Sequence, residues 1–153
     1  MKLGTPLTRA LVIAVAAGGL IAGPADAAVA CHKINAKGTG QDLGGGMTQA
    51  QIIGGGLLHG STQGIFSITG GAPPVLSIAG LVIFTTTQGT LTVTVTGTFD
   101  VANGSFVASG PVTAATGKLS AATGSLLLDG IEDLTTGKFI EDVSGLVCLD
   151  LAP

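Results

Sequence analysis

The sequence predicts an all-β protein in which a signal peptide helix precedes one domain, an antiparallel barrel of about eight strands. Three observations support this fold class: a basic start followed by an apolar run, segments in which polar and apolar residues alternate, and glycines that recur between and within those segments. Beyond the apolar run no stretch keeps a 3.6-residue apolar period long enough for a helix, although Thr48 to Ile53 could form one turn.

The first 27 residues have the order of a secretory signal peptide. Lys2 and Arg9 precede an apolar stretch at 10–23, and small residues follow it up to Ala27, where cleavage is expected. Fourteen apolar residues are short for a membrane span, so a membrane anchor is the weaker interpretation. The remaining domain, residues 28–153, is therefore expected to be secreted or periplasmic.

A second cleavage position lies after Ala30 and would make Cys31 the new N-terminus, as in bacterial lipoproteins. Ala28 stands where lipoprotein signals usually have Leu. Lipid anchoring at Cys31 is therefore the weaker alternative to simple release.

The composition of residues 28–153 narrows the possible partners. This part holds four lysines, no arginine and eight carboxylates, so it is mildly acidic and carries little charge. Nothing in it supplies a stripe of positive charge that could neutralise phosphates, which excludes nucleic acid as an expected partner. About 126 residues suit one domain, and no cofactor motif is present.

The only two cysteines, Cys31 and Cys148, stand at opposite ends of the expected mature chain. Disulfides form and persist in the oxidising compartments that exported proteins reach. We therefore predict one bridge that joins the terminal strands, with two independent buried thiols as the alternative.

The clearest strand is Thr90 to Phe99, TLTVTVTGTF, in which threonine occupies every second position. A period of two with β-branched residues on the polar side is typical of a half-buried strand, so the threonines should face water. Less regular runs predict the other strands: Cys31 to Lys37, Gln51 to His59, Gly64 to Thr69, Val75 to Thr87, Ser105 to Thr113, Ser125 to Leu134 and Lys138 to Leu149.

Glycines occur in two settings. Those in QGIF, QGTL, NGSF, TGKL, TGSL and TGKF stand just before an apolar strand residue, where a tight antiparallel hairpin needs them. Others lie inside the expected strands, where glycine permits the sharp coiling that closes a barrel. This second set favours a closed barrel over a sandwich and comprises Gly80, Gly97, Gly110, Gly130 and Gly145.

The segment Thr113 to Gly130 contains the run GKLSAATG, from Gly117 to Gly124. It resembles the glycine-framed hairpin, Gly-x-(Phe/Leu)-x-x-Ala-x-Gly, of the allene oxide cyclase and dirigent-like barrels. The stretch from Gly130 to Gly145 also looks like bacterial relatives of that family. The resemblance implies a calycin-like, eight-stranded antiparallel barrel with an apolar interior, often in a homo-oligomer. Enzymes of this family use carboxylates and aromatic residues that line the cavity, but the matched motif carries none of them over to a position in this chain.

The two histidines offer little chemistry. His59 and Ser61 could share a face of a strand, but no acid is positioned to orient the imidazole and no nucleophile elbow surrounds the serine. His32 abuts Cys31, and a zinc site would need every Cys and His of the mature chain. We expect structural roles for these residues and no metal site.

Five carboxylates flank the hairpin expected at Thr135 to Lys138. They could bind calcium through their oxygens or act as acid and base, although adjacent pairs must point to opposite faces of their strands. The simplest interpretation is a solvated hairpin end. These residues are Asp129, Glu132, Asp133, Glu141 and Asp142.

An eight-stranded barrel is just wide enough to be filled by side chains or to hold one small ligand. The first hypothesis is an exported, non-catalytic barrel that is either packed or binds a small apolar ligand. The alternatives are an isomerase or cyclase like allene oxide cyclase, and a structural or adhesive surface module. The expected lining is Leu76, Ile78, Val82, Phe84, Leu91, Val93, Val95, Phe99 and Phe106.

Overall fold

A computed structural model describes residues 28–151 of the protein, and the expected signal peptide lies outside this range. Eight antiparallel strands follow one another in sequence order, and the first pairs with the last to close a barrel. The predicted all-β fold, an eight-stranded closed barrel, is confirmed. Its elements are β1 (Ala28–Gly44), β2 (Met47–Gly54), η1 (Gly56–Leu58), β3 (Gly60–Ala72), β4 (Val75–Thr86), β5 (Gly89–Asp100), β6 (Ser105–Ala115), η2 (Gly117–Leu119), β7 (Thr123–Asp133) and β8 (Lys138–Leu151).

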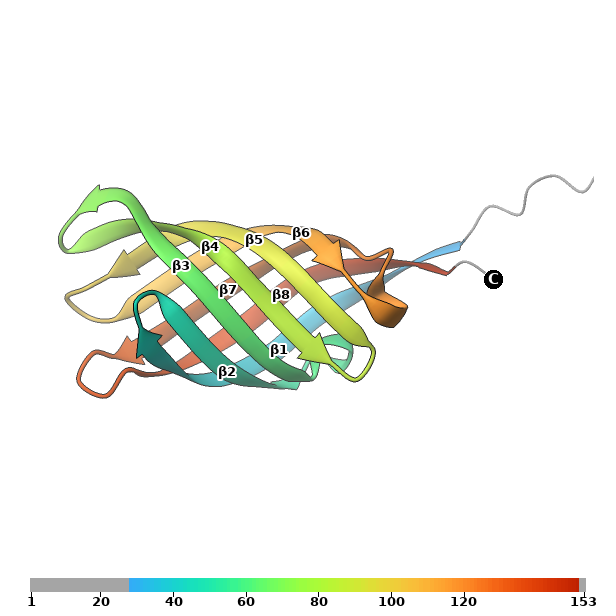
Figure 1. Ribbon diagram of the computed structural model, residues 1–153, viewed down its shortest axis with the longest axis horizontal. Helices are drawn as coiled ribbons and strands as arrows, with labels where there is room; N and C mark the ends of the chain where they lie inside the picture. The colour runs from blue at the N-terminus through green and yellow to red at the C-terminus, as the bar shows by residue number, and fades with distance from the viewer. Residues whose placement is uncertain (1–27, 152–153) are drawn as a thin grey trace, which may run out of the picture.

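The two ends of the barrel differ (Figure 1). The turns β3–β4, β5–β6 and β7–β8 lie together at one end, on the left of the view, while the start of β1, the end of β8 and the short 3-10 turns η1 and η2 lie at the other. Leu58 of η1 and Leu119 of η2 are fully buried and belong to the hydrophobic core. These two leucines therefore plug the end of the barrel at which the chain enters and leaves.

The packed core fills the half of the barrel next to this plug. Inward-facing and outward-facing residues alternate along the strands, as a period of two requires. The outer face is not uniformly polar, because large apolar side chains such as Ile65, Leu127 and Ile140 are exposed on it. In β5 the residues Leu91, Val93 and Val95 are fully buried, and the threonines between them lie on the outer face, as predicted. The rest of the core is formed by Ile34, Ala36, Ile52, Val82, Phe84, Ala108, Leu126, Leu128, Val143 and Val147.

Two expectations about the N-terminal third were wrong. Thr48 to Ile53 lies in β2 and forms no helical turn. The strand expected at Gln51 to His59 ends at Gly54, because Gly54, Gly55 and Gly56 all adopt positive φ and turn the chain into η1. His59 consequently lies outside the strands.

The first strand is also much longer than the expected Cys31 to Lys37, since β1 continues to Gly44. Its second half carries Gly38 and Gly40 at inward positions, directly opposite Glu141 and Phe139 of β8. Glycine at these positions removes the apolar alternation by which a strand is recognised in sequence. The large side chains that complete this part of the barrel wall come from the partner strand.

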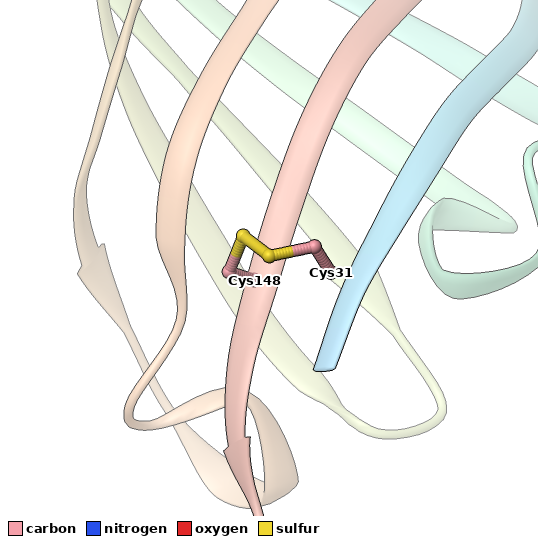
Figure 2. Close-up of a disulfide and its surroundings, with 2 residues drawn as sticks. All are labelled: Cys31 and Cys148. Atoms are coloured by element: carbon pink, nitrogen blue, oxygen red, sulfur yellow. A yellow bond between two sulfur atoms is a disulfide. The ribbon is translucent and has the colours of Figure 1, made fainter. Parts of the chain in front are cut away.

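The predicted disulfide between Cys31 and Cys148 is present (Figure 2). It joins directly paired positions near the start of β1 and the end of β8, beside the plugged end. A lipid on the Cys31 sulfur and this disulfide exclude each other, because both need the same sulfur atom. Disulfides are typical of oxidising compartments outside the cytoplasm. Within residues 28–151, no helix has the length and hydropathy that a membrane crossing would require.

Candidate functional site

The half of the barrel opposite the plug contains a cavity of about 310 Å³. Val82, Ala108 and Leu128 belong both to its lining and to the packed core, so they form its floor. At about 30 Å³ per water-sized group, the space suits a molecule of roughly ten non-hydrogen atoms. The remaining lining residues are Asp42, Gly46, Thr48, Thr62, Phe66, Ser67, Ile68, Ile78, Phe99, Phe106, Glu132, Phe139 and Glu141.

Large cavity side chains are paired with glycines on the neighbouring strand. Phe139 and Glu141 of β8 stand opposite Gly40 and Gly38 of β1, and Phe106 of β6 stands opposite Gly130 of β7. A Cβ atom on any of these three glycines would overlap the side chain across from it. Each glycine therefore makes room for a bulky residue to lie flat along the barrel wall instead of filling the interior.

Aromatic rings form much of the wall. The rings of Phe106 and Phe139 pack edge to face, with centroids 5.8 Å apart and planes at 86°. This is a favourable arrangement for two ring quadrupoles, and it fixes both rings against the wall. Phe66 and Phe99 also line the cavity, so four of the five phenylalanines in the chain face it and only Phe84 lies in the packed half.

Glu141 is the deepest charged group of the site. Only 7% of the residue is exposed, and its side chain lies over Gly38, where a Cβ added to the glycine would come within 2.6 Å of both Cγ and Oε1. No hydrogen bond or ion pair to its carboxyl is found among residues 28–151. No fully enclosed side-chain N or O atom in this range lacks a hydrogen-bond partner, so the carboxyl oxygens of Glu141 remain accessible from the cavity. Burial raises the pKa of this carboxyl to about 7, because the apolar surroundings disfavour its charged form.

Two further carboxyls lie nearer the turns. Glu132 of β7 pairs with Phe139, and burial together with the nearby charge of Asp42 raises the pKa of its carboxyl. Asp42, near the end of β1, accepts a hydrogen bond of 2.8 Å from the backbone N–H of Gly44. Among the described residues that line the cavity, none is Lys, Arg or His. The site therefore combines aromatic rings with acidic groups.

The expected lining residues fall into two groups. Ile78, Val82, Phe99 and Phe106 line the cavity. Four others, Phe84, Leu91, Val93 and Val95, are fully buried in the packed half, and Leu76 is half-buried and does not contact the cavity.

The structure divides the five acidic residues between the two faces of the barrel wall. Glu132 and Glu141 point inward, while Asp129, Asp133 and Asp142 are exposed on the outside. Asp142 forms an exposed ion pair with Lys37, with 2.6 Å between Oδ1 and Nζ. In residues 28–151 no three or more His, Cys, Asp or Glu side chains are grouped so that they could hold a metal ion.

The histidines lie away from the cavity. His59 and His32 are exposed, and Ser61 stands in β3 between inward-facing positions, so neither histidine contributes to the lining. The sequence interpretation did not identify Thr48, Thr62, Phe66 or Phe139 as cavity residues. The alternation Phe139, Glu141, Val143 was the available signal, because it places Glu141 on the same face as two apolar residues.

Comparison with known proteins adds no assignment: no family model, curated protein or solved structure matches this chain.

Proposed function

We propose that the barrel binds a small, mostly apolar molecule in its cavity, with the Glu141 carboxyl as the main polar contact. The observation that carries this proposal is the cavity inside the barrel with a buried carboxyl, unpaired within residues 28–151, on its wall. A buried carboxyl without a partner destabilises a fold, and an apolar residue would pack there at lower free energy. Such a group is the usual mark of a ligand site, in which a few polar atoms orient a ligand held by apolar contacts.

The contrast between the two halves of the barrel supports this proposal. Next to the plug, Phe84 and the valines of β5 are fully buried in the packed core. At the other end, glycines hold the aromatic rings against the wall and keep the space open. Both halves belong to the same eight strands. The open half therefore results from the side chains at its positions and not from the backbone fold.

A second candidate function is catalysis by an isomerase or cyclase related to the allene oxide cyclase and dirigent-like barrels. The apolar interior with its carboxyl and aromatic rings supports the proposed relation to that family. A carboxyl whose pKa is about 7 can both give and take a proton at neutral pH, which favours acid–base chemistry on a bound molecule. A structural or adhesive module is a third candidate. Although the barrel closes, residues 28–35 of β1 pair only with β8 and residues 67–72 of β3 pair only with β4, and large apolar side chains are exposed on the outer face. We also propose that the domain is secreted or periplasmic.

Native mass spectrometry of the protein purified from its own host tests the binding proposal. We expect a small molecule to accompany the wild-type domain and to be absent from Ala108→Leu, which extends the cavity floor into the open space. Ala79→Leu adds the same atoms to β4 on the outside of the barrel and should retain the molecule. Equal retention by both variants would argue against a ligand in the cavity.

A further inference from the structure

The chemistry of the lining restricts the kind of molecule that the cavity accepts. Three carboxyls, those of Asp42, Glu132 and Glu141, line it together with four phenylalanine rings. The faces of aromatic rings attract cations, as carboxylates do. No basic residue among the described lining residues offsets this negative character.

The environment of Glu141 is a second observation that indicates a ligand, and it does not depend on how many acidic residues line the cavity. It is 7% exposed, faces the cavity and has no hydrogen-bonding or ionic partner within residues 28–151. On the outer face of the same strand, Asp142 has Lys37 as its cation. Two adjacent carboxylates on β8 thus differ in that the outer one is paired and the inner one is open to the cavity.

We infer that the molecule bound in the cavity is an apolar primary amine, whose ammonium group pairs with Glu141 while its hydrocarbon part lies against the phenylalanine rings. This inference rests on the proposed binding function and names the ligand's chemical class. An organic cation fits better than a divalent metal ion, because the described acidic residues are not grouped closely enough to hold a metal.

Binding of an amine should depend on pH. The groups that share the cavity with Glu141 are Asp42 from β1 and Glu132 from β7, the two strands that flank β8, and strands β2 to β6 add no titratable side chain to the lining. Amines bind best when the carboxyl is ionised, so affinity should rise as pH rises through the pKa of Glu141, about 7. A neutral ligand that accepts a hydrogen bond from the protonated carboxyl would show the opposite trend.

Isothermal titration calorimetry with three matched probes tests the inference: cyclohexylmethylamine, cyclohexylmethanol and cyclohexanecarboxylate. At about pH 8 we expect the amine to bind at least about tenfold more tightly than the alcohol, and the carboxylate to bind most weakly. At about pH 5 the advantage of the amine should shrink several-fold, because Glu141 is then protonated.

The variant Glu141→Gln keeps the shape of the side chain and removes its charge. It should abolish the advantage of the amine over the alcohol. The matched control, Asp142→Asn, removes a carboxylate one residue away on the outer face and should change neither affinity. Melting curves of both variants confirm that they fold.

The outcomes separate this inference from the proposed function. Equal or tighter binding of the alcohol, or an amine preference that survives Glu141→Gln, overturns the amine assignment and leaves apolar binding standing. If none of the three probes binds, the proposed function fails and the inference falls with it.

Discussion

At the scale of single residues, Glu141 carries most of the chemistry. Its neighbours across the strands are Gly38 and Gly130, so no side chain from β1 or β7 contacts it at its own level of the wall. The two glycines leave space for the carboxyl inside the barrel wall. Burial there removes much of its contact with water, which raises its pKa to about 7. A proton is therefore held more firmly in the folded protein than in the unfolded chain.

This raised pKa predicts how stability depends on pH. Between about pH 4.5 and pH 7 the folded state holds a proton that the unfolded chain has lost, so the free energy of unfolding should fall as pH rises through this window. The loss amounts to at most about 3 kcal/mol and is complete above the folded pKa.

Glu141→Gln should lack the part of this fall that comes from Glu141, while the raised pKa of Glu132 gives a fall of the same sign in both proteins. The variant should match wild type near about pH 4.5 and be more stable at about pH 8, as measured by urea unfolding at both values. Asp142→Asn serves as control and should keep the wild-type slope. Parallel stability profiles for wild type and Glu141→Gln would show that the carboxyl does not titrate in this window.

At the scale of elements, the pairing of β1 with β8 shapes the site. Every bulky cavity residue on β8 depends on a glycine of β1, so the two strands act as one surface in which one strand supplies side chains and the other supplies space. A substitution at one of these glycines in β1 should therefore alter the site indirectly, by displacing a side chain of β8.

Gly38→Ala tests this dependence. Its new Cβ would lie 2.6 Å from Cγ and Oε1 of Glu141, so the carboxyl must move. This should lower the free energy of unfolding by about 1–3 kcal/mol. We expect a lower urea midpoint and weaker binding of the amine probe. Gly70→Ala in β3 meets no atom within 4 Å and should affect neither. Equal behaviour of the two variants would contradict the pairing argument.

The elements also show what the sequence could predict. The strand Thr90 to Phe99 was evident because its threonines alternate with core residues, and β5 follows that pattern. The second half of β1 was not evident as a strand, because Gly38 and Gly40 stand where apolar residues would mark the inner face. The large side chains that complete this part of the wall belong to β8. The cavity was beyond sequence patterns for a related reason: whether eight strands fill their interior depends on how side chains from different strands meet.

At the scale of the whole molecule, the barrel has a packed half that supplies stability and an open half that supplies a site. The packed half contains the plug formed by Leu58 and Leu119, and the Cys31–Cys148 disulfide lies beside it. The open half places a buried carboxyl and an unfilled volume, both unfavourable to folding, on the far side of that core.

The disulfide should contribute substantially to stability. It closes a loop with a sequence separation of 117, for which the loss of unfolded-state entropy corresponds to about 4–5 kcal/mol. The double variant Cys31→Ser, Cys148→Ser should unfold at a lower urea concentration than wild type, and reductant should lower the midpoint of wild type only. A free-thiol assay on the unfolded, unreduced protein should find none, and two titratable thiols would contradict the bridge.

The distribution of the phenylalanines allows the most direct test of the account. An NMR experiment with a saturating apolar probe such as cyclohexylmethanol should give intermolecular nuclear Overhauser effects to the rings of Phe66, Phe99, Phe106 and Phe139, which line the cavity. It should give none to Phe84, which is fully buried in the packed half. Contacts to Phe84 as strong as those to the other four, or no contact to any ring, would contradict a binding cavity in the open half of the barrel.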